Sequence, residues 1–230
     1  MDAPSPAPKL EAVVDHLGSR IATGAIAVGE KFTLHELGSQ FGISRTVARE
    51  AMRALEQLGM VESSRRVGIT VTPIDRWAVF DAAVISWRLA HDKTRNAQLD
   101  SLNQLRLGVE PVAARLCAQY ASRAQRAEIY AQAEKLHRLI VTPSHRVGEQ
   151  LRTDLEFHTL ILQASGNEMF AALAPVLLAM SKGKSIFGSV KRDPVAGTDD
   201  LHMDLAQSIV DGDADRAEEL SRSILDYNRA

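Results

Sequence analysis

The chain has 230 residues, of which 45% are hydrophobic and 24% charged, and its formal net charge is −2. This composition is ordinary for a soluble globular protein of one large or two modest domains. No run approaches the roughly 20 apolar residues of a membrane span, and a single cysteine, Cys117, excludes an internal disulfide framework. The expected location is a reducing cytoplasm.

The N-terminal part of the sequence predicts a short series of helices. Residues 1–8 are rich in proline and alanine and are expected to form a loose tail. Apolar residues then recur at helical spacing from Leu10 to Ala25. Two short helices follow, over residues 34–41 and 44–58. The second has an apolar back and a front of arginine and threonine, which is the pattern of a helix-turn-helix.

Two β-prone segments come next, at residues 60–64 and 68–72, with Arg65 and Arg66 between them. They predict a hairpin with a basic tip. Helices followed by such a hairpin form a winged helix-turn-helix, a fold that reads DNA. We therefore expect a DNA-binding domain over residues 9–73.

The overall charge of this segment does not itself favour nucleic acid. Residues 1–75 contain eight Lys or Arg against nine Asp or Glu. Phosphate binding depends on a local patch, and between Ser44 and Arg66 there are five arginines and three glutamates. A module with so few basic residues is expected to bind tightly only as one half of a dimer.

From Trp77 onward the pattern is helical throughout. The expected helices cover residues 79–90, 97–121, 123–140, 147–164, 169–182 and 199–229. Pro111 is expected to kink the second of these or to start a new segment. The sequence thus predicts a mainly α protein, in which the winged helix-turn-helix precedes an antiparallel α-helical bundle over residues 77–230.

Three polar side chains are expected inside this bundle. Asp154 and His158 are four residues apart, so they share one helix face, and that face is otherwise rich in leucine. His202 precedes apolar residues at helical spacing and is a third inward candidate. Buried polar groups need partners. A divalent cation would supply one, and a hydrogen-bonded cluster without metal is the alternative.

Arg106 is surrounded in sequence by apolar residues, so its guanidinium is expected to point into or near the bundle. A buried guanidinium needs an anion. Glu110, one turn further on, offers an i,i+4 ion pair, and a bound carboxylate is the other possibility. Asn167 follows Gly166 and is open to interpretation as a helix cap.

Several motifs occur in a specific order and spacing. In the N-terminal part they are Phe41-Gly42-Ile43-Ser44-Arg45, Arg49-Glu50-Ala51, Leu55, Leu58-Gly59-Met60-Val61 and Arg66-Val67-Gly68-Ile69-Thr70-Val71. In the C-terminal part they are Leu105-Arg106, Val109-Glu110-Pro111, Asp154-x-x-Phe157-His158, Ser165-Gly166-Asn167, Leu201-His202 and Gly212-Asp213-Ala214. The first set resembles the GntR family of bacterial transcription regulators. The second resembles the all-helical FCD effector domain of the FadR-type subfamily, and the stretch from Trp77 to Trp87 resembles galactonate-type repressors of sugar-acid operons.

The resemblance implies that the second helix of the motif enters the major groove and that the wing approaches the minor groove. The residues it places on DNA are Ser44, Arg45, Thr46, Arg49, His35, Arg66 and Gly68. Arginine suits a bidentate contact with guanine. The alternative is a solvated helix face on which the arginines pair with Glu50 and Glu56.

The resemblance also implies ligands for the helical domain. The implied residues are Asp154, His158 and His202 for a divalent transition metal (zinc, nickel or manganese), and Arg106 and Asn167 for an effector carboxylate. Relatives with a full metal site use one Asp and three His, and the position of the last His is Ile224 here. Three ligands with water or an effector carboxylate still suit a transition metal with open positions.

The expected function is that of a ligand-responsive regulator. It would be a homodimeric repressor of a sugar-acid or other small-carboxylate operon, released by its effector from a pseudo-palindromic DNA operator, with no membrane partner. One alternative is a helical domain that serves only as a dimerisation scaffold. Another is a metal-dependent enzyme, which would leave the N-terminal motif unexplained.

Overall fold

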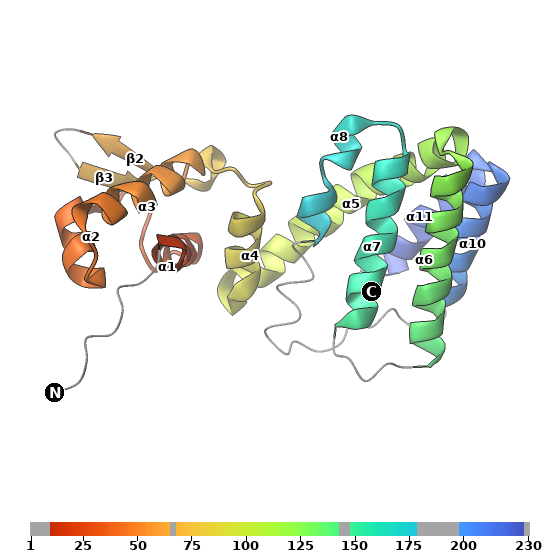
Figure 1. Ribbon diagram of the computed structural model, residues 1–230, viewed down its shortest axis with the longest axis horizontal. Helices are drawn as coiled ribbons and strands as arrows, with labels where there is room; N and C mark the ends of the chain where they lie inside the picture. Colours follow the sequence, from red (N-terminus) through yellow and green to blue (C-terminus); the bar gives the residue numbers. More distant parts are fainter. Residues whose placement is uncertain (1–9, 65–67, 143–147, 179–197, 228–230) are drawn as a thin grey trace. The chain divides into compact units, whose positions relative to one another are not determined.

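The computed structural model describes residues 10–64, 68–142, 148–178 and 198–227. The chain divides into two compact units, with the boundary between Arg95 and Asn96. The first unit combines helices with a small sheet, and the described part of the second unit is helical (Figure 1). The predicted mainly α fold is confirmed. None of the described helices is long and apolar enough to cross a membrane.

The first unit contains four α-helices, a 3-10 turn and three strands in its described part. In chain order these are α1 (Leu10–Ala22), β1 (Lys31–Phe32), α2 (Leu34–Phe41), α3 (Arg45–Gln57), β2 (Val61–Ser64), β3 (Gly68–Val71), η1 (Ile74–Arg76) and α4 (Ala82–Ala90). The sheet is antiparallel with the order β1-β3-β2. The hairpin of β2 and β3 was predicted. Strand β1 was not, because two residues carry no alternating pattern.

Local capping explains the helix-turn-helix. Thr33 and Glu36 form a capping box at the start of α2, which ends at Gly42 with φ 61°. The Ser44 side chain accepts a hydrogen bond from the Val47 backbone N–H and starts α3. Each cap satisfies backbone groups that have no partner inside the helix. The interior face of α3 is apolar and packs into the core of the first unit.

Helix α4 packs against α1 and so belongs to the first unit, although the sequence interpretation began the helical domain at Trp77. Trp87 Nε1 donates a hydrogen bond to Asp15 Oδ1 at 3.2 Å. A Cβ atom at Gly18 would overlap the Trp87 ring, so the glycine lets the two helices approach closely.

The described part of the second unit is built from helices around an apolar core. Their bounds are α5 (Asp92–Tyr120, which begins in the first unit), α6 (Arg123–Val141), α7 (Glu149–Ala164), α8 (Glu168–Ala171), α10 (Thr198–Asp211) and α11 (Ala214–Tyr227). Helix α6 packs against α7 and α10, and α10 packs against α11 (Figure 1). Cys117 is fully buried in this core.

Prolines lie within two of the helices expected from the sequence. No new helix starts at Pro111, because α5 continues through it. Proline removes one backbone donor, but the neighbouring hydrogen bonds can persist when the site is well packed, and Pro111 is buried. The helix expected over residues 169–182 is interrupted at residues 172–173, and only 168–171 and 174–178 are helical in its described part. Pro175 explains this break, because its ring would clash with the carbonyl of residue 171 in a continuous helix.

Candidate functional site

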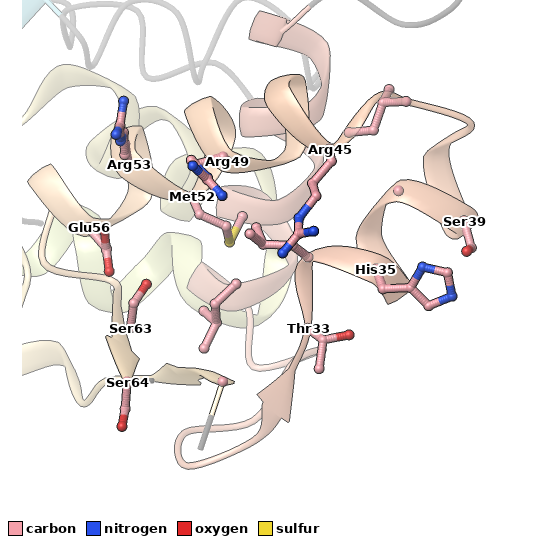
Figure 2. A pocket seen from close by; sticks show the side chains of 15 residues that line it. Thr33, His35, Ser39, Arg45, Arg49, Met52, Arg53, Glu56, Ser63 and Ser64 are labelled. Atoms are coloured by element: carbon pink, nitrogen blue, oxygen red, sulfur yellow. The ribbon is translucent and has the colours of Figure 1, made fainter. Parts of the chain in front are cut away.

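A groove of about 1080 Å³ opens in the first unit between α2, α3 and the sheet (Figure 2). Its lining includes His35 from α2, Arg45, Arg49 and Arg53 from α3, and Gly68 at the start of β3. These side chains come from the two helices of the helix-turn-helix and from the wing. The fold therefore brings most of the predicted DNA-contacting residues to one surface.

Arg45 and Arg49 are one helical turn apart and are both exposed. The described residues include no ion pair to either of them. Arg53 differs, because its Nη1 atom lies 2.9 Å from Glu50 Oε1. The alternative of arginines paired with glutamate on the helix surface thus describes Arg53. The other two guanidinium groups are available to an incoming phosphate or base edge.

The remaining predicted DNA contacts have different positions. Ser44 caps α3, and its hydroxyl hydrogen remains available for donation to a phosphate. Thr46 is exposed in the first turn of α3, where the helix dipole favours an anion, but it does not line the groove. Gly68 has a φ of 88°, which favours glycine there. Arg66 lies outside the described residues.

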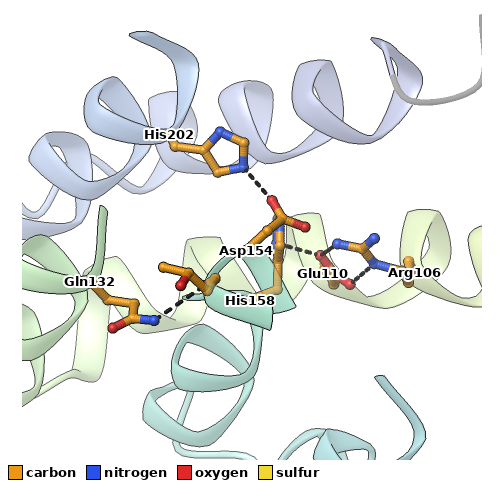
Figure 3. Close-up of polar contacts among 7 residues, drawn as sticks. Arg106, Glu110, Gln132, Asp154, His158 and His202 are labelled. Carbon is orange, nitrogen blue, oxygen red and sulfur yellow. Dashed lines mark hydrogen bonds and ion pairs between the residues drawn. The ribbon is translucent and has the colours of Figure 1, made fainter. Parts of the chain in front are cut away.

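A buried polar cluster lies in the second unit (Figure 3). It consists of Arg106 and Glu110 on α5, Asp154 and His158 on α7, and His202 on α10. All five residues are buried. The structure therefore brings together the three predicted metal ligands and the predicted effector-binding arginine from three separate helices.

The three predicted ligands have a geometry that fits a metal ion. Asp154 Oδ1 lies 3.1 Å from His202 Nε2 and 3.7 Å from His158 Nε2, and one donor atom from each residue falls within 4.8 Å of the others. Atoms bound to one ion at about 2.0–2.2 Å are about 3–4 Å apart. The buried Nε2 atom of His158 has no hydrogen-bond partner among the described residues. A cation would supply that partner.

Ile224 is fully buried within the apolar core of the second unit. Its side chain carries no atom that could bind a metal ion. Two imidazoles and one carboxylate are then the protein donors of the candidate site. Such a set leaves coordination positions for water or a ligand oxygen.

Arg106 and Glu110 form a buried two-point ion pair. Arg106 Nε lies 2.5 Å from Glu110 Oε1, and Arg106 Nη2 lies 3.3 Å from Glu110 Oε2. The i,i+4 partner considered from the sequence is thus present. Glu110 Oε2 also lies 2.8 Å from His158 Nδ1, a contact that sequence reasoning missed because it depends on how α5 packs against α7.

The charges in the cluster stabilise one another. Burial alone would raise the pKa of Glu110, but Arg106 and His158 outweigh it and lower that pKa to about 2. Burial is likewise outweighed at Asp154, where the adjacent imidazoles of His158 and His202 hold the pKa well below its ordinary value. For His158, burial would lower the pKa, but the neighbouring Glu110 carboxylate raises it to about 9. Two ionised carboxylates therefore persist inside the bundle at neutral pH.

Asn167 acts as a helix cap. Its side-chain Oδ1 accepts a hydrogen bond from the Met169 backbone N–H at 2.9 Å and so begins α8. Its own backbone N–H donates to Ser165 Oγ at 3.2 Å. Among the described residues, no hydrogen bond joins Asn167 to the polar cluster.

Models of two known protein families match this chain, one in each unit. Residues 9–71 match the model for bacterial regulatory proteins of the gntR family, and residues 101–227 match the FCD domain. The HTH-type transcriptional regulator YieP of Escherichia coli strain K12 is 28% identical to this chain over 190 residues. The matched region is 83% of this chain and 80% of YieP.

Solved structures show the same fold. A GntR protein of Streptococcus agalactiae superposes with a TM-score of 0.53 at 19% identity, over 96% of this chain and 99% of that one. Lar, which controls the expression of the Listeria monocytogenes agr system, superposes with a TM-score of 0.60 at 14% identity, over 100% and 97% of the two chains.

Proposed function

Because the chain belongs to the GntR family, as a DNA-binding transcriptional regulator with an FCD domain, we propose that it is a homodimeric repressor of a small-carboxylate catabolic operon. A sugar acid is the effector class that we favour, and the cytoplasm is the proposed location. The matching families and relatives are transcription regulators rather than enzymes. The repressor, its effector and its metal are our proposal.

The observation that carries the proposal is the buried polar cluster. A guanidinium has five N–H bonds, and Glu110 takes one from Nε and one from Nη2 of Arg106. No hydrogen bond joins Nη1 to another of the described residues, so both of its N–H bonds would be open to an effector carboxylate. Burying a charged group costs free energy unless the group is paired. A cluster of buried charges inside an apolar bundle therefore supports a binding site.

Asp154, His158 and His202 would hold a zinc, nickel or manganese ion beside Arg106. Such an ion would offer an open coordination position to an oxygen of the effector carboxylate. Arg106 would bind the same carboxylate through its remaining N–H bonds. Asn167 Oδ1 caps α8, and its side-chain NH₂ group remains able to donate to the effector, so Asn167 stays a proposed effector contact.

On the DNA side, Arg45 and Arg49 would contact base edges or phosphates from the groove of the first unit. Ser44, Thr46, His35, Arg66 and Gly68 are the proposed supporting contacts. A single module makes few phosphate contacts, so two copies on a pseudo-palindromic operator are expected. Two-fold symmetry of the protein would then match the symmetry of the operator.

Effector binding would release the repressor by favouring an arrangement of the two DNA-binding units that does not match the half-site spacing. An effector shifts this equilibrium only by its difference in affinity for the two arrangements. Coupling free energies of this kind are typically about 1–3 kcal/mol, or roughly 5–150-fold in operator affinity.

The test uses an operator selected from a random-sequence DNA pool with the full-length chain. Operator affinity is then measured by fluorescence anisotropy with gluconate, galactonate and short dicarboxylates, each with and without Zn²⁺. The proposal predicts that one acid weakens operator binding and that Arg106→Met abolishes its effect. If no acid changes operator affinity, the small-carboxylate effector is contradicted, and the dimerisation scaffold that Ile224 keeps open becomes the favoured alternative.

A further inference from the structure

The carboxylate of Glu110 contacts both Arg106 and His158 in the polar cluster (Figure 3). Its Oε1 atom accepts from Arg106 Nε at 2.5 Å. Its Oε2 atom lies 3.3 Å from Arg106 Nη2 and 2.8 Å from His158 Nδ1. Glu110 is only 2% exposed and His158 only 1%, so water does not compete for these contacts. One side chain therefore connects the proposed effector arginine with a proposed metal ligand.

The contact with His158 decides which ring nitrogen is available. A nitrogen that faces a carboxylate carries the hydrogen and donates it, so Nδ1 is the N–H side of the ring. Nε2 lies farther from its carboxylate, at 3.7 Å from Asp154 Oδ1, which is too long for a hydrogen bond, so Nε2 is the nitrogen whose lone pair an ion would bind. Histidine ligands commonly donate their second N–H to a carboxylate, which fixes the orientation of the ring and makes it a better donor.

The contact between Glu110 and Arg106 orients the guanidinium. Arg106 and Glu110 are one turn apart on α5, so the helix itself holds their side chains together. Glu110 occupies the Nε side of the guanidinium. The Nη1 group is thereby held in a constant direction, which gives an arriving carboxylate a preorganised partner.

We infer that Glu110 is the positioning residue of the site. It holds the imidazole of His158 for the metal and the guanidinium of Arg106 for the effector, so that the two binding events depend on one another through a single carboxylate. This inference deepens the proposed function and rests on it. A Glu110 that only neutralised Arg106 would contribute to stability and leave metal affinity unchanged.

The experiment measures Zn²⁺ affinity of the full-length chain, stripped with a chelator and titrated against a chromophoric competitor. Glu110→Gln removes the negative charge at nearly constant shape. The double variant Arg106→Met, Glu110→Leu removes the whole ion pair and leaves no buried unpaired charge, which favours folding. We expect both to bind Zn²⁺ about 10–100-fold more weakly than the wild type.

The matched control is Ile129→Ala. Ile129 lies in the same apolar core, outside the polar cluster, and its truncation lowers stability through a cavity. We expect its Zn²⁺ affinity to equal that of the wild type. A fall in Zn²⁺ affinity that accompanied every destabilising change would therefore assign Glu110 a purely structural role.

A spectroscopic readout separates positioning from stability. In zinc-loaded protein labelled with ¹⁵N-histidine, we expect a slowly exchanging Nδ1–H resonance from His158, assigned by its loss in His158→Gln. The double variant should lose this protection, because no acceptor remains opposite Nδ1.

The outcomes test the metal site and the positioning role of Glu110 separately. If the wild type binds Zn²⁺ and both Glu110 variants bind it equally well, the positioning role is wrong and the metal site stands. If the wild type binds no Zn²⁺, the metal site and the role of Glu110 fall together. Should Glu110→Gln not fold, the double variant decides the result.

Discussion

His202 Nε2 lies 3.1 Å from Asp154 Oδ1, so α10 and α7 meet through two buried polar side chains inside an apolar bundle. His158 completes the group from the same face of α7 as Asp154. The side chains converge although nothing in the local sequence of either helix requires it. Removing one of them should therefore affect ligand binding more than it affects helix formation.

Restoring a fourth ligand should tighten the metal site. Ile224→His would place an imidazole at the position that the family resemblance assigns to a fourth ligand. We expect tighter Zn²⁺ binding together with a lower melting temperature of the metal-free protein, because an unpaired buried polar group costs about 1–3 kcal/mol. Competition titration and thermal unfolding measure both effects. Equal Zn²⁺ affinity in the variant and the wild type would show that residue 224 is too far from the ion.

The two kinds of arginine on α3 should behave differently on the operator. Arg45→Ala is expected to weaken operator binding by about 1–3 kcal/mol. It should also lower the slope of log affinity against log salt concentration by about 1. Arg53→Ala is the matched control, since its guanidinium is paired with Glu50. Fluorescence anisotropy at several salt concentrations tests this, and equal losses in the two variants would contradict the assignment.

The metal-free protein should be most stable at mildly acidic pH. The pKa of Glu110 is lowered from 4.5 to about 2, so its stabilisation is complete above pH 4.5 and is lost as the pH falls toward 2. The pKa of His158 is raised from 6.5 to about 9, so its stabilisation is complete below pH 6.5 and is lost as the pH rises through 9.

Urea unfolding in EDTA is the measurement for this pH dependence. Between pH 6 and pH 9.5 we expect the free energy of unfolding to fall by about 3 kcal/mol from His158 alone. His158→Gln should remove most of that slope. A variant with the same alkaline loss as the wild type would mean that another group is responsible.

Arg126 on α6 should be a major source of stability in the second unit. Its guanidinium donates to the carbonyl oxygens of Ala118 and Ala121 near the end of α5, and to those of Ile209 and Val210 near the end of α10. Such carbonyls have no partner within their helices.

We expect Arg126→Met to lower the free energy of unfolding by about 2–4 kcal/mol, because hydrogen bonds to charged groups contribute about 1.5–3 kcal/mol each and are not additive. Arg123→Met, at an exposed position on the same helix, is the control and should have little effect. Chemical denaturation compares the two, and similar stabilities would be inconsistent with the bridging role.

Local sequence patterns predicted most of the secondary-structure elements. Helix α2 has the predicted bounds, and α3 begins after the predicted Ser44 cap, because capping and apolar spacing act within a few residues. The break before Pro175 was missed, although a proline so placed gives a physical signal for it. The pairing of β1 with β3 was missed because it depends on contacts between distant residues.

Local sequence patterns predicted part of the candidate site, and helix packing determines the rest. Asp154 and His158 were paired by their i,i+4 spacing, and the apolar residues around His202 and Arg106 predicted that both point inward. The family resemblance supplied their roles as ligands. The contact between Glu110 and His158 joins α5 to α7 and has no sequence signature. The docking of α4 on α1 through Trp87 is of the same kind. Helix-to-helix packing determines such contacts, and a periodic pattern only states which face is buried.

The most direct test of the account is the melting temperature of the full-length chain with sugar acids and short dicarboxylates, before and after EDTA, in the wild type and Asp154→Ala. At about 100 times its dissociation constant, a ligand stabilises by roughly 2.7 kcal/mol. That corresponds to about 5–10 °C in a chain of this size. We predict such a shift with one acid, lost after EDTA and in the variant. A shift that survives both treatments would contradict a metal-held carboxylate effector.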